Sequence, residues 1–100
     1  MLKNSSLEYI RAVVRKYDID RAYLFGSCLE KSEEEAGDID LAIEKAGEIG
    51  IMEFLRMHGE LDDAEALGGK NVDIVNLDMD APINILIRDE MELVYEKPRP

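Results

Sequence analysis

The sequence has little of several residue types, and each scarcity narrows the kind of protein that it encodes. It contains one cysteine, Cys28, so no disulfide can form within the chain, which is typical of a cytoplasmic protein. It contains no tryptophan, and no apolar run approaches the roughly 20 residues that cross a bilayer. The start of the chain lacks the apolar segment of a secretion signal. We therefore expect a soluble, cytoplasmic protein without a membrane partner.

Basic residues are also scarce. The chain has 12 Lys and Arg against 23 Asp and Glu, and its formal net charge is −11. Such a surface repels nucleic acid, because phosphate recognition needs clusters of Lys and Arg. It is compatible with divalent cations or with a basic protein partner that is steered by charge. The same acidity also serves solubility alone, and composition does not separate these interpretations.

The length of 100 residues predicts one domain, which we expect over residues 1–96 with a disordered tail at 97–100. Periodicity predicts, in chain order, a helix at 5–17, a strand at 22–25, a short helix at 27–31, a strand at 38–44, a helix at 51–67, a strand at 71–77, a helix from Pro82 to about 88 and a strand at 91–96. This order predicts an α+β fold with a small mixed sheet of three to four strands and helices mainly on one face.

Two local signals define the long helices more closely. Ser5 and Glu8 have the spacing of a capping box, which predicts the start of the first helix. Gly68 and Gly69 would supply the C-cap of the second long helix. The apolar stripe of that second helix is expected to consist of Ile51, Phe54 or Leu55, His58 and Leu61.

Three aspartates lie in otherwise apolar predicted strands: Asp38, Asp40 and Asp73. Asp38 and Asp40 are two residues apart, so their side chains leave the same face of a strand, roughly 6–7 Å apart. If the 71–77 strand lies beside the 38–44 strand, Asp73 completes a cluster of three carboxylates. Their mutual repulsion raises their pKa values, and a divalent cation removes that cost. Carboxylate oxygens favour Mg²⁺ or Mn²⁺, and paired ions serve phosphoryl or nucleotidyl transfer.

A Gly-Ser pair follows the first short predicted strand. Gly26 lets the backbone approach a ligand closely at the end of that strand. Ser27 offers a hydroxyl and an N–H at the start of a short helix, and both suit a phosphate oxygen. By itself, a Gly-Ser pair is most often a turn, and an Asp-x-Asp pair is most often a solvated strand edge. Their combination, in this order and spacing, is much more specific for a phosphate-and-metal site.

The same segments resemble a known family. "LFGS" at 24–27, ten intervening residues, "DIDLAIE" at 38–44 and "NVDIVNL" at 71–77 are similar to the minimal nucleotidyltransferases, the MNT family of the polymerase-beta-like nucleotidyltransferase superfamily. The resemblance extends from about Ser5 to Tyr95. It implies a polymerase-beta-like core in a chain that is little more than the catalytic unit.

The resemblance also implies roles for individual residues. Gly26 and Ser27 would hold the triphosphate of ATP, and Asp38 and Asp40 would bind two Mg²⁺. Asp73 would contribute to the metal site where the acceptor hydroxyl is activated. The reaction would transfer a nucleotidyl group, typically AMP from ATP. In this family the protein often serves as antitoxin to a HEPN-domain toxin, and some members AMPylate a tyrosine of the toxin.

The chain departs from the family pattern just after the Gly-Ser pair. Where family members commonly have Gly-Ser-Arg-Ala-Arg-Gly, residues 26–31 read Gly-Ser-Cys-Leu-Glu-Lys. Each lost charge-assisted contact weakens triphosphate binding by about 0.5–3 kcal/mol, and Lys31 compensates in part. Three functions therefore remain open: a catalytic antitoxin, an inactive MNT-fold antitoxin that neutralises its partner by occlusion, and a nucleotide- or metal-sensing subunit. The acceptor surface must come from a partner or from a second copy, so a homo-oligomer also remains open.

Overall fold

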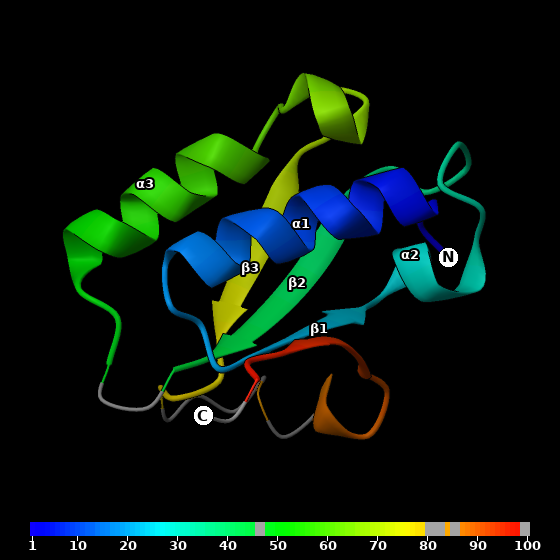
Figure 1. Cartoon of the computed structure of the whole chain (residues 1–100). Helices are drawn as coiled ribbons and strands as arrows, with labels where there is room; N and C mark the ends of the chain where they lie inside the picture. The colour runs from blue at the N-terminus through cyan, green and yellow to red at the C-terminus, as the bar shows by residue number, and fades with distance from the viewer. Residues whose placement is uncertain (46–47, 80–83, 85–86, 99–100) are drawn as a thin grey trace.

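The computed structural model describes residues 1–45, 48–79, 84 and 87–98. Within them, one mixed sheet has the order β3-β2-β1-β4 and is formed by β1 (Arg21–Phe25), β2 (Ile39–Glu44), β3 (Val72–Asn76) and β4 (Glu92–Glu96). Strand β1 is antiparallel to β2 and β4, and β2 is parallel to β3. Helices α1 (Asn4–Lys16) and α3 (Ile51–Leu61) lie on one face of the sheet (Figure 1). The predicted α+β fold is confirmed.

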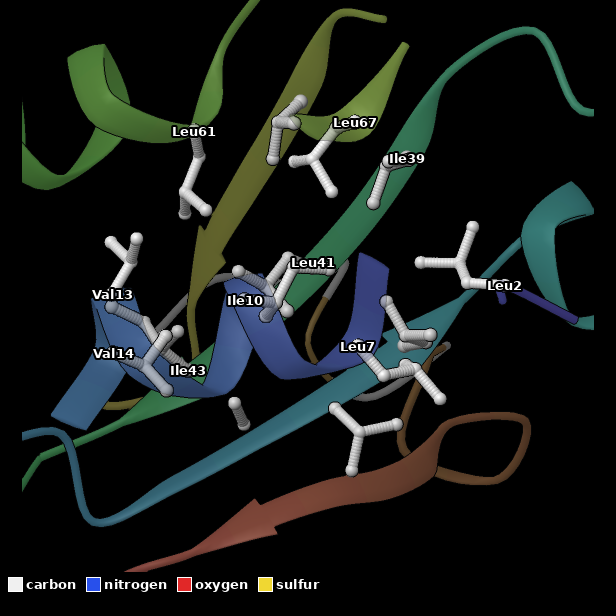
Figure 2. Close-up of a cluster of buried hydrophobic side chains, with 14 of the residues drawn as sticks. Leu2, Leu7, Ile10, Val13, Val14, Ile39, Leu41, Ile43, Leu61 and Leu67 are labelled. Atoms are coloured by element: carbon white, nitrogen blue, oxygen red, sulfur yellow. The ribbon is translucent and has the colours of Figure 1, made fainter. Parts of the chain in front are cut away.

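The main core lies between the sheet and helix α1. Along β2, Ile39, Leu41 and Ile43 occupy every second position and are fully buried on the side of the helices. Figure 2 shows Ile10 and Val14 of α1 packed over this row of side chains. The period of two in the strand and the helical spacing in α1 therefore bury one common apolar face.

A second, smaller core lies on the opposite side of the sheet. Ala42 of β2 packs there with Leu77 and Ile87, and Phe25 of β1 lies against them. This explains why Ala42 is buried although it shares its strand face with Asp40. The expected helix from Pro82 to about Arg88 lies largely outside the described residues; Asn84, Ile87 and Arg88 have helical backbone.

The predicted capping box at the start of α1 is wrong. The N-cap residue is Lys3, and no side chain caps this end of the helix. The backbone N–H of Leu7 donates to the carbonyl oxygen of Lys3 at 3.0 Å. Leu2 is buried just before the helix, and the N–H of Lys3 donates to Oε1 of Glu33 at 3.2 Å. These tertiary contacts start the helix earlier than Ser5.

The predicted extent of the second long helix is also wrong. Helix α3 ends at Leu61, and a short 3₁₀-helix, η1 (Glu65–Leu67), follows. Asp62 is extended, and the N–H of Asp63 donates to the carbonyl oxygen of Lys70 at 2.9 Å. The chain turns here to lead into β3, which a continuous helix would prevent. Gly68, predicted as the C-cap of the long helix, instead ends η1 in the left-handed conformation.

The apolar stripe of α3 matches the predicted one only in part: Leu61 is buried and Phe54 packs against the main core, as expected. Leu61 and Met57 are the fully buried side chains of α3, whereas Ile51 and Leu55 are exposed. His58 is half-buried, and its Nε2 lies 2.9 Å from the carbonyl oxygen of Val72. The helix therefore packs through its C-terminal half, and its first turns leave apolar side chains uncovered.

The short helix α2 (Ser27–Glu30) forms where it was predicted, directly after β1. Near the end of the chain, the N–H of Lys97 donates to the carbonyl oxygen of Asp20 at 2.8 Å, and residues 99–100 of the expected tail lie outside the described residues. In the described part of the chain, every helix is too short or too polar to traverse a lipid bilayer.

Candidate active site

Two of the three aspartates are direct neighbours across adjoining strands. Asp40 of β2 and Asp73 of β3 are register partners in the parallel pair. Paired residues of neighbouring parallel strands lie about 5 Å apart and project from the same face of the sheet. Asp38 stands two residues before Asp40, at the entry to β2. The condition set by the sequence, that the 71–77 segment lies beside the 38–44 segment, is therefore met.

The Gly-Ser turn lies against the same carboxylate. Phe25, the last residue of β1, pairs with Asp40, so Gly26 follows directly beside it. Gly26 has a φ of +76°, and a Cβ built on it would lie 2.3 Å from Oδ2 of Asp40. Only glycine allows both the positive φ and this close approach. The turn therefore lies against Asp40, one of the three aspartates predicted as site residues.

The electrostatics of Asp40 reflect its neighbours. Partial burial raises the pKa of the Asp40 carboxyl above its ordinary value, and the charges of Asp73 and Asp38 raise it further. Each of these effects disfavours the ionised carboxylate. A bound cation would act in the opposite direction, because it stabilises the charged form.

The start of β3 is held firmly beside β2. The N–H of Ile39 donates to the carbonyl oxygen of Asn71 at 3.0 Å, which joins the two strands just before the aspartates. On the outer edge of β3, Oδ1 of Asp62 accepts the N–H of Val72 at 2.8 Å. Lys70 donates from Nζ to the carbonyl oxygen of Ala36 at 2.8 Å and so ties the acidic loop to the same corner. These contacts anchor the entry to β3, just before Asp73.

An open pocket of about 700 Å³ lies next to the Gly-Ser turn. Its lining consists of Gly26, Ser27, Leu29, Glu30, Lys31 and Glu90. Lys31 and Ser27, both predicted as nucleotide contacts, thus face the same space. The two glutamates give this space an acidic character that a triphosphate would have to overcome.

Sequence reasoning missed Glu90. This residue reaches the pocket because β4 pairs with β1, with Glu92 opposite Leu24. No local pattern in the sequence predicts this pairing, because the two strands are far apart in the chain.

The departure at position 28 proves less important for the pocket than the sequence suggests. Cys28 is fully buried in the main core, and its Sγ donates to the carbonyl oxygen of Phe25 at 3.1 Å. Burial raises the pKa of this thiol, so it is not a reactive thiolate. Glu30, in contrast, is exposed and lines the pocket. The unfavourable charge therefore comes from position 30 rather than from position 28.

The carboxylates fit a hard divalent cation in chemistry and in strand position. Asp38, Asp40 and Asp73 supply oxygen ligands, which Mg²⁺ and Mn²⁺ prefer. As the side chains stand, no three acidic, histidine or cysteine groups among the described residues are placed to hold a metal ion. Asp38 and Asp73 are exposed, so their side chains can change rotamer without unpacking the core.

The fold and the paired aspartates beside a Gly-Ser turn define a nucleotidyltransferase-type domain. The family model "Polymerase beta, Nucleotidyltransferase" matches residues 8–99. The chain therefore belongs to the polymerase beta nucleotidyltransferase family. No curated protein matches the chain in sequence.

Solved structures with a similar fold include toxin–antitoxin complexes. A crystal structure of a toxin–antitoxin with AMP-PNP has a TM-score of 0.73 at 21% identity and covers 95% of this chain and 75% of that chain. The tri-AMPylated Shewanella oneidensis HEPN toxin in complex with MNT antitoxin gives 0.69 at 21% identity, with 92% and 71% covered. The toxin–antitoxin MntA-HepT gives 0.70 at 19% identity, with 95% and 74% covered. At these identities the likeness establishes the fold.

Proposed function

We propose that this chain is a Mg²⁺-dependent nucleotidyltransferase that transfers AMP from ATP to a hydroxyl group. The hydroxyl oxygen loses its proton and bonds to the α-phosphorus, and pyrophosphate leaves. The observation that carries the proposal is the register pair of Asp40 and Asp73, with Gly26 placed against Asp40. These groups stand at one end of the sheet, beside an open pocket that Ser27 and Lys31 line. This arrangement is suited to binding a phosphate group together with the cations that would accompany it.

Each residue has a distinct role in this proposal. Asp38, Asp40 and Asp73 hold divalent cations, which when bound neutralise phosphate charge and favour deprotonation of the acceptor hydroxyl. Gly26 leaves room for the phosphates to approach the backbone, and Ser27 donates from its hydroxyl and N–H to a phosphate oxygen. Lys31 supplies a positive charge in the pocket, where Glu30 and Glu90 oppose it.

The acceptor we propose is a tyrosine of a HEPN-type toxin, which makes the chain an antitoxin. Two observations support this partner. The fold is similar to that of MNT antitoxins solved with HEPN toxins, one of which is tri-AMPylated. The net charge of −11 also favours a basic partner over a second acidic one.

Transfer of label from α-labelled ATP to the candidate toxin tests this function. We expect label on the toxin in the presence of Mg²⁺ and none after chelation. The double variant Asp38→Asn, Asp40→Asn should abolish transfer. A control variant, Glu8→Gln with Glu65→Gln, removes the same charge at two exposed positions outside the site and should retain it. Undiminished transfer by the aspartate variant would refute the catalytic role of these residues.

A second candidate is neutralisation by occlusion, without chemistry. The acidic lining of the pocket, with Glu30 and Glu90 around Lys31, favours it because these charges weaken nucleotide binding. It predicts that the aspartate double variant still neutralises the toxin in growing cells. If that variant binds the toxin yet fails to neutralise it, occlusion alone is rejected.

The third alternative, a sensing subunit, is tested by calorimetric titration with ATP, with and without Mg²⁺. A sensing subunit would bind ATP without turning it over.

A further inference from the structure

Exposed apolar side chains gather at the start of α3 and at the end of β3. We define the apolar patch as Ile51, Met52, Leu55 and Met79, which are 75%, 60%, 56% and 65% exposed. Ile51 and Met79 also line a hollow of about 280 Å³, together with Ile49, Phe54 and Asn76. Large apolar side chains that cluster around a hollow on the surface mark an interaction site.

The apolar patch lies away from the aspartates. Asn76, in the lining of the hollow, pairs with Ile43, three residues along the strands from the pair of Asp73 and Asp40. Three residues of a strand correspond to roughly 10 Å. Figure 1 shows α3 beginning at the side toward which the arrowheads of β2 and β3 point, whereas α2 lies at the other side. The apolar patch and the candidate active site therefore lie toward opposite ends of β2 and β3.

The charges around the apolar patch are predominantly negative. Glu48, Glu53 and Asp78 are exposed next to it in the chain. Lys45 is paired there: its Nζ lies 3.3 Å from Oε2 of Glu53, and its backbone N–H donates to Oδ2 of Asp78 at 2.7 Å. Arg56 is also exposed next to the patch in the chain. Among the described residues, carboxylates therefore outnumber cations at the rim of the patch.

These charges decide which occupant fits the patch. A second copy of the chain would bring an identical acidic rim and a further net charge of −11, which opposes association. An anionic lipid surface is repelled for the same reason. A segment that combines apolar side chains with Lys or Arg satisfies both the hollow and its rim.

We propose that the apolar patch binds an amphipathic segment of a basic partner protein. The apolar side chains of that segment fill the hollow beside Ile51 and Met79, and its cations pair with Glu48, Glu53 and Asp78. Binding of this kind needs no catalysis. If the partner is also the substrate, docking at the patch would hold its acceptor hydroxyl near the aspartates. That addition rests on the proposed function.

Methionine methyl groups report on this proposal, because Met52 and Met79 lie in the patch whereas Met57 is buried and Met91 lies elsewhere. The probes are three synthetic helical peptides: one with a leucine face and a lysine face, one with glutamate in place of lysine, and one with alanine in place of leucine. In spectra of the full chain with ¹³C-methyl methionine, the Leu/Lys peptide should shift the signals of Met52 and Met79. The other two peptides should bind at least about tenfold more weakly.

Matched variants locate the binding surface. Leu55→Lys should weaken binding of the Leu/Lys peptide by about tenfold, because it adds a cation and removes apolar area. Leu93→Lys is the control, since Leu93 of β4 is also exposed, at 47%, and lies outside the patch. Circular dichroism verifies the fold of both variants, and Leu55→Gln replaces Leu55→Lys if the latter is unfolded.

Four results would each overturn the proposal. They are absence of binding at millimolar Leu/Lys peptide, equal binding of the glutamate or the alanine peptide, shifts confined to methyl groups outside the patch, and a dimer in sedimentation that Leu55→Lys dissociates. The last result would assign the patch to a second copy. All four are independent of label transfer from ATP, so they leave the proposed reaction to its own test.

Discussion

At the scale of single residues, Gly26 decides whether Asp40 can stand at its place in the site. Its φ is +76°, and a Cβ at this position would lie 2.3 Å from Oδ2 of Asp40. We expect Gly26→Ala to destabilise the fold by about 1–3 kcal/mol and to displace the Asp40 carboxylate. Urea denaturation measures the first effect, and a weaker affinity for Mn²⁺ in calorimetry measures the second.

The matched control is Gly59→Ala in the middle of α3. No atom lies within 4 Å of a Cβ built there, and the residue is helical. We expect this change to stabilise the protein by about 0.5–1 kcal/mol, because alanine restricts the unfolded chain more than glycine does. Equal effects of the two substitutions would show that the contact with Asp40 has no special importance.

The Asp40 carboxylate itself should reduce the stability of the metal-free protein. Burial and the charges of Asp73 and Asp38 raise its pKa in the folded state. The folded state therefore loses stability, relative to the unfolded chain, as pH rises above the unfolded value of about 3.9 and through the higher folded value. At about pH 7, we expect Asp40→Asn to melt at a higher temperature than the unmodified protein without metal.

The comparison has two further arms. Well below about pH 3.9, where Asp40 is protonated in both states, the two proteins should melt alike. Mg²⁺ should raise the melting temperature of the unmodified protein and have a smaller effect on Asp40→Asn. A lower melting temperature for Asp40→Asn at neutral pH would contradict the assigned repulsion.

At the scale of elements, Glu60 joins the two helices that cover the sheet. Its Oε1 lies 2.6 Å from Nζ of Lys16, its Oε2 accepts from the hydroxyl of Tyr17, and its carbonyl oxygen accepts from the hydroxyl of Tyr9 at 2.6 Å. The hydrogen bonds from Lys16 and Tyr17 lower the pKa of the Glu60 carboxyl. Its contribution to stability is thus present above the unfolded value of about 4.3 and is lost as pH falls through the folded value.

We therefore expect Glu60→Gln to lower the melting temperature at about pH 7 and to have little effect at about pH 2, where Glu60 is protonated in both states. Thermal denaturation at both pH values measures this difference. Glu65→Gln is the control, because Glu65 is exposed in η1. A loss of the same size at both pH values would indicate that packing, rather than charge, is what the substitution disturbs.

At the scale of the whole molecule, the excess of negative charge should oppose folding. The formal net charge is −11, and the ion pairs among the described residues involve partly exposed side chains, which contribute little individually. Salt screens both effects, but the repulsion extends over the whole surface. We expect the melting temperature to rise between about 10 and 300 mM NaCl in calorimetry. A fall would show that the specific ion pairs outweigh the general repulsion.

The sequence and the structure agree where a signal is local. Alternation in β2 identified a strand with Ile39, Leu41 and Ile43 on its buried face, and the Gly-Ser pair correctly predicted the end of β1 and the start of α2. They disagree where the burial of a side chain depends on which other element covers it. Helical spacing predicted Ile51 as buried in α3, but periodicity does not reveal where the covering element stops, and the structure buries Met57 instead.

The sequence by itself determined the chemistry that this protein carries: three aspartates in apolar strands, a Gly-Ser pair after the first strand, and an excess of acidic residues. These features depend on residue type and spacing, which can be read directly from the sequence. The tertiary structure alone decided that Asp40 and Asp73 are neighbours, that Cys28 faces the core, that Glu90 reaches the pocket and that the apolar patch is uncovered. Each of these depends on contacts between segments distant in sequence, and the side chains that make such contacts are chosen by packing of the whole sheet rather than by any local pattern.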